Sequence, residues 1–116
     1  MFKKAAVFTD IHFGLKSNSK VHNDDCEEFI DWYIDQAKDN GCETGIFCGD
    51  WHHNRNSLNL TTMDSTIRCL EKLGKSFGTF LKSQNQNKVS VSGDVRESTI
   101  LLKHYFIDGL LSCGLD

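Results

Sequence analysis

The chain has 116 residues, of which 39% are hydrophobic and 25% charged, and its formal net charge is −3. This size and composition predict one globular domain or part of one. The small negative charge gives no general attraction to nucleic acid, so DNA binding would need a local basic patch or bound cations. No apolar stretch approaches the roughly 18 residues of a membrane span, and the first residues turn polar too early for a signal peptide. We therefore expect a cytoplasmic protein that makes no contact with a membrane.

Five cysteines occur without a C-x-x-C pair. Cys26 and Cys69 fall on apolar faces of expected helices, and Cys48 falls in an expected strand. Such spacing in a cytosolic protein predicts reduced, buried thiols rather than disulfides.

The first half of the chain alternates strand-like and helix-like patterns. Residues 3–9 (KKAAVFT) and 44–48 are short apolar runs typical of strands. Between them, apolar residues recur every three or four positions over residues 26–37, which predicts an amphipathic helix. A strand, helix, strand order of this length predicts two parallel strands.

Polar residues define the expected limits of that first helix. The stretch 16–25 (KSNSKVHNDD) is predicted to be a loop that leads into the helix, with Asn23 or Asp24 as its cap. Asn40 and Gly41 supply the signal for its end.

A second helix is expected after a loop at residues 51–60. Thr61 to Asp64 resemble a capping box of the acidic kind, and an apolar stripe follows over residues 63–73. Gly74 predicts the end of this helix.

The pattern weakens beyond Gly74. Residues 75–88 are placed as a helix remnant followed by a loop, and residues 89–92 (VSVS) as a third strand. Residues 99–107 (TILLKHYFI) fit a helix and a strand equally well. The sequence thus predicts an α/β fold with a βαβα start.

Acidic and imidazole side chains gather where the two expected strands end. Asp10 and His12 follow the first strand, and Gly49 and Asp50 follow the second. The carboxyl ends of parallel strands share one edge of a sheet, which is where open α/β sheets keep their chemistry. Residues i and i+2 of an extended chain project to one side, so these three ligands can grip one ion. We expect a metal site here, with two metals.

Two other interpretations compete with this one. A lone Asp-x-His occurs by chance in many proteins. The aspartates would also suit the acidic pocket of a receiver domain, but that interpretation lacks a second acidic residue beside Asp10 and a lysine after a later strand. His22 and His104 have no partners at metal-binding spacing and are expected to be structural or exposed.

The sequence Asp10-x-His12 followed by Gly49-Asp50 resembles the first two signatures of the calcineurin-like metallophosphoesterases. The Phe13-Gly14 continuation is similar to the branch that contains the bacterial SbcD nuclease and its bacteriophage counterparts. The resemblance covers about residues 1–75 and implies a partial metallophosphoesterase fold, truncated relative to a full four-layer domain. One incomplete domain over residues 1–116 is expected, with residues 76–116 divergent.

This resemblance also implies a role for each site residue. Asp10 and His12 would bind the first ion and Asp50 would bridge two divalent ions, with manganese favoured over iron, zinc or magnesium. His53 would act near the scissile phosphate as a catalytic group. Asn54 and Arg55 would contact substrate, and Trp51 would be a stacking surface or a loop anchor.

The later family signatures are absent. The nearest candidate for the third is the segment 92–97 (SGDVRE), where Asp94 could serve as a metal ligand but Val95 stands in the place of a histidine. Valine can neither donate a proton nor stabilise negative charge. Three explanations stay open: a truncated or frame-shifted copy, a short paralogue with half a site, or a chain that obtains its missing ligands from another protein.

The function implied is a fragment of a metal-dependent DNA phosphodiesterase, with little hydrolysis by the isolated chain. Its partners would be DNA, an SbcC-type ATPase and a second copy of the chain, in the host cytoplasm if a bacteriophage encodes it. The alternatives are a non-catalytic paralogue that keeps half of the metal site for binding or assembly, and a small-molecule or protein phosphatase of the same superfamily.

Overall fold

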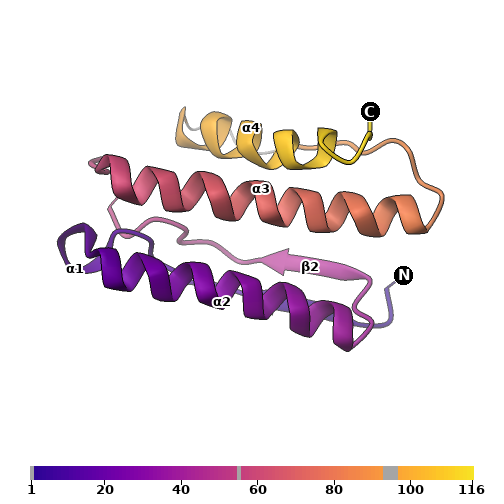
Figure 1. Ribbon diagram of the computed structural model, residues 1–116, viewed down its shortest axis with the longest axis horizontal. Helices are drawn as coiled ribbons and strands as arrows, with labels where there is room; N and C mark the ends of the chain where they lie inside the picture. The colour runs from indigo at the N-terminus through magenta and orange to yellow at the C-terminus, as the bar shows by residue number, and fades with distance from the viewer. Residues whose placement is uncertain (1, 55, 93–96) are drawn as a thin grey trace. The chain divides into compact units, whose positions relative to one another are not determined.

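The computed structural model describes residues 2–54, 56–92 and 97–116. The order of its elements is β1 (Ala5–Phe8), α1 (Leu15–Asn18), α2 (Lys20–Asp39), β2 (Thr44–Phe47), α3 (Leu60–Ser83) and α4 (Glu97–Leu111) (Figure 1). This confirms the predicted α/β class. No described helix is both long enough and apolar enough to cross a membrane.

Two compact units divide the chain, which we call the amino-terminal unit (Met1–Ser65) and the carboxyl-terminal unit (Thr66–Asp116). Helix α3 begins in the first unit and continues in the second. The single domain expected from the sequence stays a prediction.

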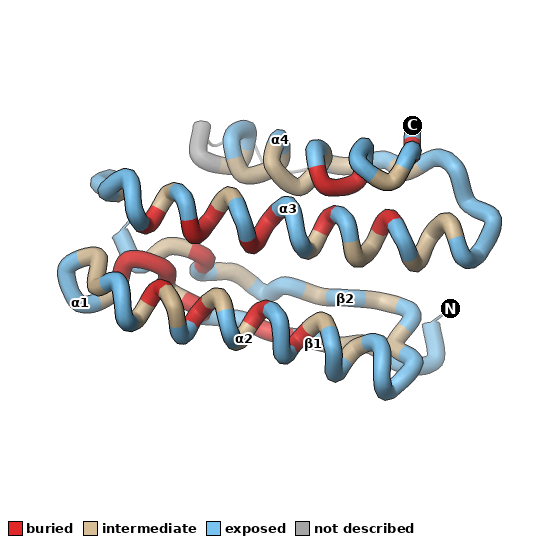
Figure 2. The backbone as a smooth tube through the Cα atoms, in the orientation of Figure 1, coloured by how far each residue is buried: buried red, intermediate tan, exposed pale blue. Residues whose placement is uncertain are grey.

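The amino-terminal unit is built on a two-stranded sheet. Strands β1 and β2 run parallel, with Ala5 opposite Thr44 and Phe8 opposite Phe47, as the sequence predicts. Helix α2 packs on this sheet, because the Tyr33 hydroxyl donates to the Ala6 carbonyl at 2.7 Å and the Phe8 and Tyr33 rings lie 4.6 Å apart. Buried positions recur along α2 in Figure 2, which is the burial pattern of an amphipathic helix.

Helix α2 begins earlier than predicted. The expected loop at 16–25 is wrong, because α2 starts at Lys20 and Ser19 caps it by accepting a hydrogen bond from the His22 amide. Asn23, one of the two expected caps, is instead fully buried inside the helix. A polar run carries no apolar periodicity, so the pattern could not show that its last residues are helical.

Both expected limits of the second helix are also wrong. The cap is Asn59, whose Oδ1 accepts from the Thr62 amide at 2.8 Å, rather than the box at Thr61 to Asp64. The helix then runs through Gly74 to Ser83. Gly74 lies against α4, where an added Cβ would collide with the Phe106 carbonyl oxygen. The glycine therefore permits a close helix contact and does not end the helix.

The end of the chain is helical where the sequence left two options. Residues 99–107 lie within α4. The predicted strand at 89–92 is wrong, because none of these residues joins a strand; the Val89 amide instead donates to the Asp116 carbonyl at 3.1 Å. The Asp116 amide returns a bond to Asn87 at 2.9 Å, which ties the end of the chain to this segment.

Candidate metal centre

The two strands stay paired beyond the sheet, over residues 9–13 and 49–53, which we call the paired strand ends. The Asp10 amide donates to the Gly49 carbonyl at 3.0 Å and the His12 amide to the Asp50 carbonyl at 3.1 Å. A further parallel bridge joins Phe13 to His52. The side chains of these two segments are therefore held at neighbouring positions by backbone bonds.

Three of these residues have left-handed backbones. The φ angles are 54° at Asp10, 53° at His12 and 57° at Asp50. Such angles cost about 1–2 kcal/mol for a residue with a Cβ, although Asp and His tolerate them better than most. Gly49, at φ 121°, precedes Asp50 in a conformation that suits glycine. Strain of this kind concentrates at functional sites.

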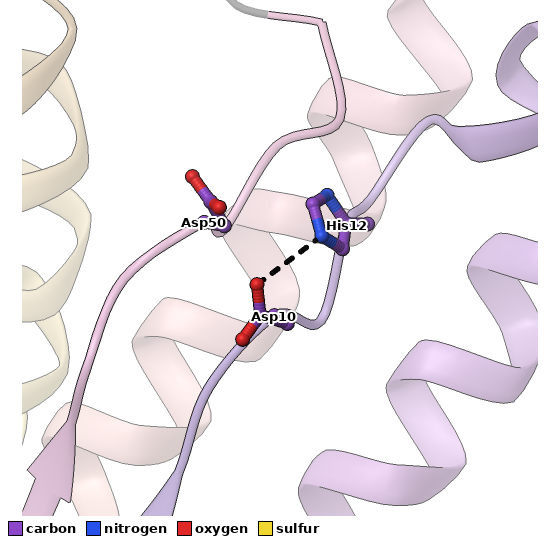
Figure 3. Close-up of side chains that lie close together, drawn as sticks. All are labelled: Asp10, His12 and Asp50. Carbon is purple, nitrogen blue, oxygen red and sulfur yellow. Dashed lines mark ion pairs between the residues drawn. The ribbon is translucent and has the colours of Figure 1, made fainter.

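The same three residues form a cluster able to hold a cation. One ligand atom from each of Asp10, His12 and Asp50 lies within 4.8 Å of the others. Figure 3 shows the side chains gathered between the two segments, with His12 Nε2 at 3.4 Å from Asp10 Oδ1. Asp10 Oδ2 also accepts from the Thr9 hydroxyl at 2.8 Å, which orients its carboxylate.

The donor set fits a divalent metal ion. Two carboxylates and an imidazole are ligands that several divalent ions accept. The two acidic side chains lie close together at an exposed position, so a cation would offset their mutual repulsion. Within the described part of the chain, His12 Nδ1 is buried and has no hydrogen-bond partner. The other ring nitrogen, Nε2, is the one that lies near Asp10 and could bind an ion.

The other predicted site residues have diverse positions. The His53 ring lies 5.6 Å from the His12 ring and its side chain is exposed. Asn54 turns toward its own loop, since its Oδ1 accepts from the Asn56 amide at 2.9 Å. Arg55 and Asp94 lie outside the described residues, so their predicted roles as substrate contact and metal ligand stay predictions.

Aromatic and imidazole side chains anchor the second strand end. Trp51 is 6% exposed and stacks on Phe13 with ring centroids 5.2 Å apart. This favours the loop-anchor interpretation of Trp51 over a stacking surface. Burial lowers the pKa of His52 to about 4, so its ring is neutral at physiological pH.

Helix α2 contributes two side chains that the sequence did not connect with the cluster. His22 Nε2 lies 3.0 Å from the His12 carbonyl oxygen, and Cys26 Sγ donates to the Ile11 carbonyl at 3.3 Å. Their i, i+4 spacing predicts a shared helix face. No pattern in the sequence shows that this face meets residues 11 and 12.

The thiols agree in part with expectation. The described cysteines are free, and Cys26 and Cys69 are buried as predicted. Cys48 is exposed, so its predicted burial is wrong: it follows β2 rather than lying within it.

Comparison with known protein families matches the second half of the chain. The sequence model of phosphoglucomutase/phosphomannomutase, alpha/beta/alpha domain I, matches residues 54–116, which is more than half of the chain. No curated protein and no solved structure matches. The matched region begins after Asp50, so the assignment and the cluster rest on different residues.

This match overturns the metallophosphoesterase resemblance. The expected partial metallophosphoesterase fold, the DNA nuclease function and its phosphatase and half-site alternatives are not supported, because the matched family is a different superfamily. The resemblance rested on two short motifs, and short motifs of Asp, His and Gly recur at unrelated strand ends. The expected partners stay predictions.

The metal expectation changes as well. The matched family typically uses a divalent ion, magnesium, so a divalent metal agrees with the family and a preference for manganese does not. The chain belongs to the phosphoglucomutase/phosphomannomutase family, through its α/β/α domain I.

Proposed function

We propose that this chain is a phosphosugar-binding domain of the phosphohexomutase type, in which Asp10, His12 and Asp50 hold a divalent cation that faces the sugar phosphate. The cluster carries the proposal: three ligand atoms within 4.8 Å, on strand ends held together by backbone bonds. The family name supplies the substrate class, a phosphorylated hexose.

Charge explains why a cation belongs in this arrangement. A phosphate group that approached Asp10 and Asp50 alone would meet two carboxylates and be repelled. A bound divalent ion reverses the local charge and polarises phosphoryl oxygens. The family's magnesium is the first ion to test.

The residues of the chain then divide the remaining work. Asp10 and Asp50 supply oxygen ligands, and His12 supplies a nitrogen ligand from the same edge. His53, exposed beside His12, is in a position to donate a hydrogen bond to a phosphate oxygen. The Thr9 hydroxyl holds one oxygen of Asp10 and so limits how that carboxylate can turn.

Calorimetric titration with MgCl₂ tests the cation site. We expect the wild-type chain to bind and Asp50→Asn to weaken binding by about tenfold or more. Asparagine tolerates a left-handed backbone, so this change keeps the fold and removes a charge. Asp35→Asn removes the same charge from an exposed position on α2 and serves as the control. Equal affinities for the two variants would contradict the proposed site.

A second titration tests the substrate class. With magnesium present, we expect glucose 1-phosphate to bind more tightly than inorganic phosphate, and binding to disappear when EDTA removes the ion. A chain that binds magnesium but gives the same affinity for both phosphates would retain the cation site and lose the phosphohexose assignment.

A further inference from the structure

Helix α2 holds the backbone of the first strand end through three side chains. His22 Nε2 meets the His12 carbonyl at 3.0 Å, and Cys26 Sγ donates to the Ile11 carbonyl at 3.3 Å. Asn23 Oδ1 accepts from the Gly14 amide at 2.9 Å. Backbone groups at positions 11, 12 and 14 are thus all bonded to one turn of the same helix.

The first two of these contacts act as a pair. His22 and Cys26 lie one turn apart, and Cys26 Sγ is 3.4 Å from His22 Nε2. A carbonyl oxygen only accepts, so Nε2 carries its proton in the contact with the His12 carbonyl. Cys26 is 5% exposed, so its bond is shielded from competing water.

The segment that they hold needs support. His12 has φ 53°, a conformation that costs about 1–2 kcal/mol for a residue with a Cβ. Hydrogen bonds to the carbonyls on either side of the Cα of His12 oppose relaxation to an extended backbone. Such relaxation would change the direction of the imidazole relative to Asp10.

We propose that His22 and Cys26 are positioning residues: they fix the left-handed backbone at His12 and thereby set the affinity of the cluster for a divalent cation without touching the ion. The effect on affinity rests on the cation site proposed above, whereas the effect on the backbone can be measured in the metal-free protein.

Two substitutions at one position separate positioning from general packing. His22→Gln keeps an N–H at a similar distance along the side chain, whereas His22→Leu removes it. Val21→Ala changes an exposed neighbour on the same turn, 72% exposed, and is the matched control.

Amide hydrogen exchange of the metal-free protein reports on the backbone. The His12 and Phe13 amides donate to Asp50 and Trp51 across the paired strand ends. We expect His22→Leu to speed exchange at these two amides by about tenfold, which is about 1.4 kcal/mol, and to leave the Ile30 amide of α2 unchanged. We expect His22→Gln and Val21→Ala to match the wild type within about twofold.

Titration with MgCl₂ gives the second readout, in which we expect about tenfold weaker binding for His22→Leu and recovery in His22→Gln. Unchanged exchange at His12 and Phe13 in His22→Leu would overturn the inference. A wild-type chain that binds no magnesium, together with the expected exchange result, would support backbone positioning and overturn the cation site. If His22→Leu speeds exchange at Ile30 as well, the substitution has loosened α2 itself. Cys26→Ala is then the deciding variant, with exchange measured at the same His12 and Phe13 amides.

Discussion

The paired strand ends and the contact between α3 and α4 are held together in opposite ways. In the carboxyl-terminal unit, Gly74 and Gly109 let two regular helices approach until the backbones touch. In the amino-terminal unit, the backbone leaves its preferred angles at Asp10, His12 and Asp50. Side chains of α2 form hydrogen bonds with the carbonyls of Ile11 and His12. The three side chains of the candidate metal cluster lie on the strained side of this comparison, which agrees with strain serving a site.

The largest expected effect on stability comes from a substitution that disrupts the contact between α3 and α4. An alanine normally stabilises a helix by about 1 kcal/mol relative to glycine, but the Cβ of Gly74→Ala would collide with the Phe106 carbonyl oxygen and lie 3.1 Å from Gly109 Cα. We expect the free energy of unfolding to fall by about 3 kcal/mol and the melting temperature, followed by circular dichroism, to fall on the order of 10 °C.

Gly41→Ala is the control for this substitution. Nothing lies within 4 Å of a Cβ at Gly41, and only its φ of 62° opposes the change. The expected loss is about 1 kcal/mol. A Gly74→Ala variant as stable as the wild type would show that α3 and α4 do not depend on the close approach.

Thiol labelling follows the two regions separately. Burial, with smaller contributions from Asp25 and Glu27, raises the pKa of the Cys26 thiol to about 11 from its ordinary 9.0. At pH 8, a thiol with this raised pKa has about 100-fold less thiolate than an ordinary cysteine. We expect iodoacetamide to label exposed Cys48 at least about 100-fold faster than Cys26, measured by peptide mass spectrometry, and the rates to converge in urea.

Thiol labelling of the Gly74→Ala variant tests whether the two regions open independently. Cys69 is fully buried in α3, in the carboxyl-terminal unit. We expect its labelling to speed up in the variant while that of Cys26 stays slow. Equal acceleration at both thiols would show that the two regions open together.

The next largest loss of stability is expected from a buried hydrogen-bond network in the amino-terminal unit. Asn23 accepts from the Gly14 amide and donates to Thr62 Oγ1 at 2.8 Å. Asn23→Ala leaves a buried donor without its partner, so we expect a loss of about 2 kcal/mol in the free energy of unfolding by urea. Asn40→Ala removes the same side chain from the exposed end of α2 and should cost far less. Similar losses would mean that the network contributes little.

Sequence reasoning found the elements whose period repeats and missed those fixed by tertiary contacts. The two parallel strands and the body of α2 are confirmed, because apolar alternation and helical spacing are local signals. The sequence predicts a helix end at Gly74 because the contact that explains this glycine lies on α4, more than 30 residues away in the chain. Asn23 read as a cap because its partner Thr62 is equally remote.

The candidate site was predicted in part for the same reason. Asp10, His12 and Asp50 meet because parallel strands end at one edge, which spacing can show. Their left-handed backbones and the contact from His22 to the His12 carbonyl are features of the folded chain, which spacing cannot show. The two motifs also suggested the wrong family. They lie before residue 54, outside the region that matches the phosphoglucomutase/phosphomannomutase family.

The smallest expected effect comes from the exposed side of α2. Lys20 Nζ lies 2.6 Å from Asp24 Oδ2, one helical turn away, and the two side chains are 73% and 49% exposed. Water and salt screen such a pair, so we expect Lys20→Ala to cost at most about 0.5 kcal/mol. In urea unfolding at 1 M NaCl that difference should vanish, whereas the loss in Asn23→Ala should persist because its hydrogen bonds join neutral, buried groups. If the loss in Asn23→Ala also depended on salt, surface charge and not buried hydrogen bonds would hold the first strand end in place. The contrast between the two regions would then be weaker.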